Sequence, residues 1–140
     1  MKLIGCLLFL ALFVSACGGG SDSPTAPSVN VPFSTVDVRV GTGAEATVGR
    51  TASVNYALYH YSATATDNKG GLLQNGPFSF TVGGTQTIAG FNQATLGMKV
   101  GGLRRAIVPP NLAYGSTPPA NSGIAANETL VFEIELLAVQ

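Results

Sequence analysis

Residues 97–115 constrain the fold of this chain more than any other stretch. They run from a helix-like end through a pair of glycines and the apolar segment 103–108 to a pair of prolines. Adjacent glycines favour a tight turn, and the segment after them has the composition of a strand. Because proline has no backbone N–H to donate to a sheet, the strand must stop there and residues 111–115 must form a loop. We expect this loop to lift Tyr114 off the sheet, with its ring and hydroxyl free to bind a ligand.

The composition fits one β-rich domain. The chain has 140 residues, of which 46% are hydrophobic, together with 18 glycines and 8 prolines that favour many turns. A chain of this length has room for a single core. Seven basic and seven acidic residues leave no net charge, and no basic patch stands out. Nucleic acid is therefore not expected as a partner.

Alternating apolar residues predict an antiparallel sheet of about five strands. In the segment 34–40, three valines fall on one side, which predicts a half-buried strand. Residues 67–76 are rich in glycine and asparagine and predict a loop. The last strand turns two glutamates outward, where Arg104 or Arg105 on a neighbouring strand would sit opposite them. The expected strands are 34–40, 51–61, 78–82, 103–108 and 129–139.

One short helix completes the expected fold. Residues 91–98 place apolar side chains at helical spacing between bordering glycines. About two turns of helix are not stable alone in water, so this helix must lie against the sheet. The prediction is an α+β fold in which the antiparallel sheet wraps around one short α-helix.

The N-terminal residues have the pattern of a targeting segment. Lys2 precedes an apolar run over residues 3–14, which is too short to span a bilayer comfortably. The run ends in small residues before Cys17, a pattern that resembles the bacterial lipobox. The resemblance implies removal of residues 1–16, lipid on Cys17, and an extracytoplasmic protein anchored to a bacterial membrane. In a Gram-negative host this would be the periplasmic side of the outer membrane. An ordinary secretory signal with an incidental cysteine is the alternative.

A tether follows the targeting segment. Residues 17–32 are rich in glycine, serine and proline and predict a flexible connection, so the folded domain would span residues 33–140. Cys6 lies in the segment to be removed, so the mature chain would keep Cys17 alone. An intramolecular disulfide or a cysteine-based metal site is then not expected.

Four ordered motifs resemble the FKBP-type peptidyl-prolyl isomerase domain. Besides residues 97–115 they are 76–83 (Gly-Pro-Phe-Ser-Phe-Thr-Val-Gly), 88–91 (Ile-Ala-Gly-Phe) and 130–137 (Leu-Val-Phe-Glu-Ile-Glu-Leu-Leu). The resemblance runs from about residue 36 to residue 139, in the family's order and near its spacing. It implies the same α+β fold and a peptidyl-prolyl cis-trans isomerase that acts on proline-containing unfolded or secreted polypeptides. It implies no cofactor and no metal.

The resemblance also implies a set of site residues. Tyr114 matches the tyrosine whose hydroxyl binds the carbonyl before the proline, and Ile88 matches the residue whose backbone N–H binds a ligand carbonyl. Asp67 lies eleven residues after Tyr56, which is the spacing of the family's pocket aspartate. Thr87 and Ile124 are expected to contact the substrate. The implied catalytic set is Tyr56, Asp67, Phe78, Ile88, Phe91, Tyr114 and Phe132.

Simpler interpretations stand beside some of these assignments. Asp67 lies among asparagine and glycine, where a solvated turn residue is common. Phe132 is an inward aromatic of the kind that usually belongs to the core. His60 has no evident partner and is interpreted as a surface residue. Thr66 takes the place that usually holds a phenylalanine before the aspartate, which predicts a wider and wetter pocket.

The sequence alone is consistent with three functions. The first is the isomerase, and the second is a non-catalytic chaperone or adaptor that binds proline-containing peptides. The third is a structural lipoprotein whose pocket is filled by its own side chains. In each case we expect a monomer.

Overall fold

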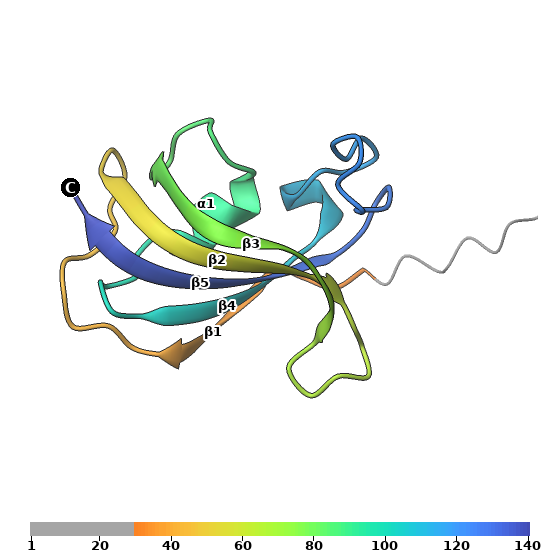
Figure 1. Cartoon of the computed structure of the whole chain (residues 1–140), viewed down its shortest axis with the longest axis horizontal. Coiled ribbons are helices and arrows are strands. Elements are labelled where there is room, and N and C mark those ends of the chain that lie inside the picture. Colours follow the sequence, from red (N-terminus) through yellow and green to blue (C-terminus); the bar gives the residue numbers. More distant parts are fainter. Residues whose placement is uncertain (1–29) are drawn as a thin grey trace, which may run out of the picture.

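The computed structural model describes residues 30–140 (Figure 1). The predicted targeting segment, the predicted lipidation site Cys17 and nearly all of the predicted tether lie outside these residues. Within the described part, no helix is long and apolar enough to cross a membrane.

The described residues form one antiparallel sheet of five strands in the order β1-β4-β5-β2-β3 (Figure 1). A helix, α1 (Ala89–Thr95), packs on one face, and a short 3-10 helix, η1 (Pro110–Leu112), follows β4. This is the predicted α+β architecture. The strands are β1 (Ser34–Arg39), β2 (Thr51–Tyr61), β3 (Lys69–Thr81), β4 (Leu103–Val108) and β5 (Leu130–Val139).

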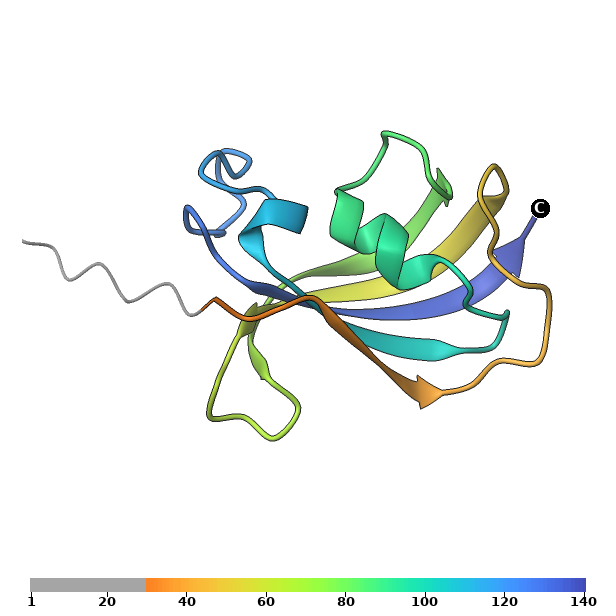
Figure 2. The same cartoon turned by 180° about the vertical axis from the view of Figure 1, so that it is seen from behind.

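The core lies between the sheet and α1, which crosses the same face as the loop after β4 (Figure 2). Side chains that alternate inward along the central strands fill this space. We call the opposite side, which carries Arg105 and Glu133, the outer face. Buried members of the core from the strands are Ala52, Val54, Leu58, Phe80, Ala106, Val108, Leu130, Phe132, Ile134 and Leu136.

Two contacts fix α1 against β4. Gly90 allows a close approach, because a Cβ atom at this position would lie 2.2 Å from Cγ1 of Val108. At the other end, Nη1 of Arg104 donates to the carbonyl oxygens of Ala94 and Leu96, which have lost their helical partners. The helix covers Ala89–Thr95 rather than the predicted 91–98, because Gly97 takes a φ of +76° and ends it.

The region predicted as a loop at 67–76 belongs mostly to a strand. β3 covers Lys69–Thr81 and pairs with β2 along its whole length, from Tyr61 opposite Lys69 to Thr51 opposite Thr81. Pairing with a long, regular β2 overrides the turn preference of the glycines, because strand formation depends on its neighbours more than on local propensity. The register shifts twice near Tyr59, so the pairing contains bulges.

β1 is a strand as predicted, but it is not half-buried. Every residue of β1 is exposed, and Val36 is 60% exposed. Val36 lies opposite Arg105 and so points to the outer face, whereas Asp37 lies opposite Arg104 on the α1 side. The pairing with β4 shifts between Asp37 and Arg39, so Arg39 lies opposite Leu103 and pairs with Glu135 on the outer face rather than sharing a side with Asp37. Alternation therefore separated Val36 from Asp37 correctly but missed this bulge.

The two arginines of β4 point to opposite faces. Arg105 lies opposite Glu133, and its guanidinium donates to that carboxylate. Arg104 lies opposite Ile134 on the α1 side and pairs with Asp37. The predicted arginine partner of Glu133 is therefore Arg105, while Glu135 pairs with Arg39 of β1.

Candidate active site

A pocket opens between the sheet and α1, with a cavity of about 120 Å³. This volume is several times the ~10–15 Å³ that one water molecule needs, so the cavity has room for a small ring. It gathers most of the predicted site residues from four elements and two loops. Its lining residues are Tyr56, Leu58, Gln74, Phe78, Gln86, Thr87, Ile88, Phe91, Tyr114 and Phe132.

Phe91 forms the floor of the pocket at the start of α1. Its ring is almost fully buried and meets the ring of Phe132 edge-on, with centroids 5.3 Å apart. Tyr56 and Phe78 also meet it edge-on, at 5.8 and 6.3 Å. Edge-on aromatic pairs of this kind hold each other in a fixed orientation. The pocket therefore presents a rigid apolar surface, and Phe132 belongs both to the core and to the pocket lining.

Tyr114 lies where the sequence predicted it, on the loop that follows the proline pair. Its side chain is half-buried, and burial raises the pKa of its hydroxyl above the usual value. Burial, and then the nearby Tyr114, raise the pKa of Tyr56 as well. Neither hydroxyl has a hydrogen-bond partner among residues 30–140. At neutral pH both tyrosines are therefore protonated and available to donate into the cavity.

Ile88 supplies a third free donor. It is the N-cap of α1, and its carbonyl oxygen accepts from the N–H groups of Phe91 and Asn92 at 3.2 and 3.3 Å. Within the described residues, the N–H of Ile88 itself donates to no acceptor. Such unpaired N–H groups at a helix start are available to a ligand. Thr87 lies beside it in the lining, and its hydroxyl donates to the Ile88 carbonyl at 3.2 Å.

The loop that carries Ile88 is held from both sides. The side-chain oxygen of Asn92 accepts from the N–H of Gly83, and its amide nitrogen donates to the carbonyl of Gly84, both at 2.9 Å. The side-chain oxygen of Gln86 accepts from the N–H of Thr81 at 2.7 Å. The loop is thus tied to β3 and α1, which keeps the Ile88 N–H at the edge of the cavity.

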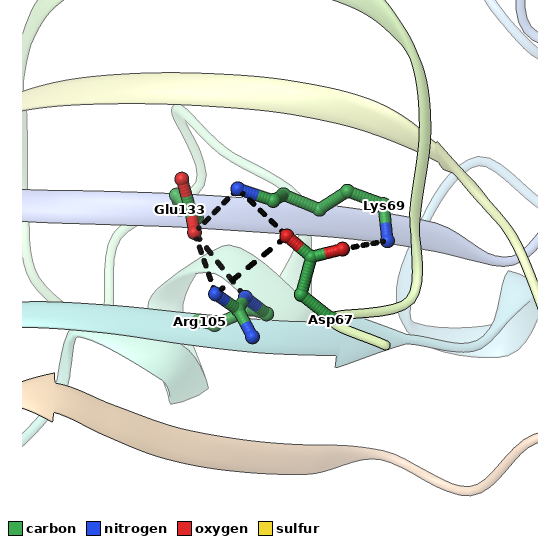
Figure 3. A network of polar contacts seen from close by, with 4 residues as sticks. All are labelled: Asp67, Lys69, Arg105 and Glu133. Atoms are coloured by element: carbon green, nitrogen blue, oxygen red, sulfur yellow. Dashed lines mark hydrogen bonds and ion pairs between the residues drawn. The ribbon is translucent and has the colours of Figure 1, made fainter. Parts of the chain in front are cut away.

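Asp67 lies outside the pocket, contrary to prediction. It belongs to a network on the outer face with Lys69, Arg105 and Glu133 (Figure 3). Its carboxylate lies 3.1 Å from Nζ of Lys69, and hydrogen bonds from Lys69 lower the pKa of Asp67. The β2-β3 hairpin extends beyond the pocket and bends toward the outer face, so spacing from Tyr56 pointed to the wrong residue.

One lining residue of β3 was not predicted from the sequence. Gln74 lines the cavity, and Leu73 before it is half-buried against the core. Thr66, which was expected to make the pocket wider and wetter, is exposed in the hairpin loop and lies outside the lining. Leu58 shares a face of β2 with Tyr56, because residues two apart in a strand point to the same side, but no local signal marked Gln74.

Two further residues differ from the expectation. Ile124 is not part of the lining; its half-buried side chain packs against the core. His60 is not an isolated surface residue, because its Nδ1 contacts the carboxylate of Glu128. That carboxylate also accepts from the N–H of Ala125 at 2.7 Å, so the pair joins β2 to the loop before β5. Among the described residues, no group of His, Cys, Asp and Glu side chains is suited to hold a metal ion.

The family model for FKBP-type peptidyl-prolyl cis-trans isomerase matches residues 43–137, which include every residue of the pocket. The chain belongs to this family. An FK506-binding protein of Streptomyces anulatus is 39% identical over 103 residues, covering 74% of this chain and 82% of that protein. The 39 kDa FK506-binding nuclear protein of Drosophila melanogaster is 44% identical over 108 residues, covering 74% of this chain.

The FKBP-type domain is also similar to solved structures. A peptidyl-prolyl cis-trans isomerase from Pseudomonas syringae superposes with a TM-score of 0.64 at 26% identity, covering 77% of this chain and 75% of that one. The chain spans 28% of the length of the Drosophila relative, so the similarity concerns only part of that protein.

Proposed function

We propose that this FKBP-type domain catalyses cis-trans isomerisation of prolyl bonds in unfolded or secreted proteins. The observation that carries the proposal is the pocket, in which a buried aromatic floor lies beneath free donors. A substrate proline ring would pack on Phe91, while the Tyr114 hydroxyl and the Ile88 N–H would bind carbonyl oxygens of the substrate. No lining residue is a nucleophile with an adjacent base, so the pocket suits a reaction without covalent chemistry.

The reaction needs little more than such a pocket. The prolyl bond has a rotation barrier of about 18–20 kcal/mol because of its partial double-bond character. Rotation breaks this conjugation, so donors that bind the twisted amide better than the planar one lower the barrier. An apolar floor that excludes water strengthens those hydrogen bonds. A rate acceleration of ~10⁵ would require about 7 kcal/mol of such stabilisation.

The test is the cis-to-trans rate of a short Xaa-Pro peptide with the purified protein. We expect a clear acceleration that falls roughly 3- to 10-fold in Tyr114→Phe, because the variant loses one hydrogen bond to the substrate. Peptide binding is followed in parallel by NMR. Binding without acceleration would replace the isomerase with the peptide-binding chaperone, and absence of both would support a structural lipoprotein.

We further propose that the protein acts outside the cytoplasm as a lipoprotein. Residues 1–16 would be removed, lipid on Cys17 would anchor the chain, and residues 17–32 would hold the domain away from the membrane as a monomer. Attachment of several acyl chains gives stable anchoring where one chain binds only marginally. The support is the apolar run that ends in small residues before Cys17.

Labelling with a fatty-acid analogue in a bacterial host tests the anchor. The wild-type protein should take up label and sediment with membranes, and Cys17→Ala should do neither. Label on both proteins, or membrane association of Cys17→Ala, would contradict the assignment. Cys6→Ala is the matched control, because this cysteine lies within the segment to be removed.

A further inference from the structure

Gln74 is aimed at the pocket by a bulge in β3. In the β2-β3 pairing, Gln74 lies opposite Leu58 and Leu72 lies opposite Tyr59, so Leu73 is an extra residue without a partner. Residues directly opposite each other in an antiparallel pair share a face of the sheet. Since Leu58 is buried and lines the pocket, Gln74 stands on the pocket side. Bulges commonly re-aim side chains next to active sites.

The extra residue is itself held in place. Leu73 packs against the core, and its Cδ2 lies 3.1 Å from the position that a Cβ atom would take at Gly123. Leu73 is thereby covered by the loop before β5, which has no side chain at this point. The bulge is therefore part of the packed structure, and the backbone of Gln74 is fixed although its side chain is exposed.

The side chain of Gln74 is free to bind. Among the described residues it makes no hydrogen bond, whereas the other amide of the lining, Gln86, already accepts from the N–H of Thr81. All residues of the lining are uncharged. The backbone around a proline needs such a donor. Proline has no N–H, so the backbone groups there that need a hydrogen-bond partner are mainly carbonyl oxygens, which accept hydrogen bonds.

We propose that Gln74 binds the substrate, with its side-chain amide nitrogen donating to a backbone carbonyl of the chain that carries the proline. This inference rests on the proposed isomerase function. Ile88 supplies a donor from the start of α1, Tyr114 supplies one from the loop after η1, and Gln74 supplies one from β3 at the edge of the sheet. A carboxylate at this position could not donate at neutral pH, whereas the amide of Gln74 can.

Three variants test the role of the donor. Gln74→Leu keeps the approximate size of the side chain and removes its polar atoms, and Gln74→Glu keeps its shape and removes the donor at neutral pH. We expect each to lower kcat/KM at pH 7 by roughly 3- to 10-fold, the effect of one lost hydrogen bond. Gln93→Glu is the control, because Gln93 lies on the exposed side of α1 and outside the lining.

The pH profile separates a donor from a merely structural residue. A glutamic acid has a pKa of about 4.3, and its protonated form donates again. Relative to wild type at the same pH, Gln74→Glu should regain activity as the pH falls from 7 toward 4, while Gln74→Leu and Gln93→Glu should not. Circular dichroism at each pH verifies that the proteins are folded.

The peptide affinity of each variant, measured by NMR, keeps this test independent of catalysis. If the wild type binds the peptide without accelerating isomerisation, the isomerase proposal fails and the affinities decide the role of Gln74. Wild-type rate and affinity in Gln74→Leu would overturn the inference. So would a Gln74→Glu variant whose deficit is unchanged at pH 4.

Discussion

Replacing Gly90 by alanine tests how closely α1 must approach β4. The new Cβ would lie 2.2 Å from Cγ1 of Val108 and 2.9 Å from the carbonyl oxygen of Leu112. Carbon atoms in contact normally lie about 3.5–4.0 Å apart, so one of the two elements must retreat by about 1.3 Å. Val108 is fully buried and the second neighbour is backbone, so neither can move aside alone.

The expected cost follows from these contacts. Overpacking a core by one methyl group typically costs about 1–3 kcal/mol. Alanine recovers at most ~1 kcal/mol of helix propensity, and less in the first turn where Gly90 lies. We therefore expect a net loss of about 1–2 kcal/mol in unfolding free energy and a melting temperature lower by about 5–10 °C. Phe91 moves with the helix, and a displacement of ~1 Å can reduce activity up to ~10²-fold.

Urea unfolding followed by circular dichroism measures the loss, and the peptide assay measures activity. Gly71→Ala is the control, because its Cβ would meet only Cδ2 of His60 at an ordinary 3.5 Å. Adding Val108→Ala to Gly90→Ala should restore part of the loss, so the two effects should be non-additive. A Gly90→Ala protein that unfolds at the wild-type urea concentration would refute the packing argument.

Further predictions concern charged and titratable groups. Arg104→Met removes the donor to the α1 carbonyls, so stability should fall by about 1–2 kcal/mol in urea unfolding; unchanged stability would contradict this role. The hydrogen bond that Arg104 donates to Asp37 lowers the pKa of this carboxyl group. The ionised Asp37 therefore stabilises the fold above the unfolded-state pKa, and this contribution is lost as the pH falls below about 4. Arg104→Met should therefore weaken the acid dependence of the melting temperature. Asp67→Asn should leave kcat/KM within about 2-fold of wild type, because Asp67 lies outside the pocket. A 10-fold loss would show instead that Asp67 takes part in the site. Finally, because the pKa values of Tyr56 and Tyr114 are raised, kcat should be flat from pH 6 to beyond the ordinary tyrosine pKa of about 10. A fall in kcat below the ordinary tyrosine pKa that Tyr114→Phe abolishes would contradict this prediction.

Residues 97–115 were predictable because their constraints are local. A glycine pair, an apolar segment and two prolines leave few alternatives, and β4 covers Leu103–Val108 as expected. The prolines then end the strand, and Tyr114 reaches the cavity. Positions that follow from such constraints carry over from sequence to structure with little dependence on the rest of the fold.

The β2-β3 hairpin could not be placed in the same way. Its glycines suggest a loop, and only the partner strand makes the segment from Lys69 onward extended. A bulge changes which residue faces the pocket, and nothing in the local sequence positions it. Counting from Tyr56 consequently selected Asp67 instead of Gln74. β1 shows a related limit, because alternation separates two sides of a strand without saying which one is covered.

β4 links the stability of the fold to the geometry of the site. Val108 sets the distance to the start of α1, where Phe91 forms the pocket floor, and Arg104 binds the carbonyls at its other end. The chain that continues from β4 carries Tyr114 into the lining of the same cavity. The floor and a principal donor are thus positioned by one strand. Substitutions that displace β4 should therefore reduce activity before they unfold the protein, because β4 positions both Phe91 and Tyr114.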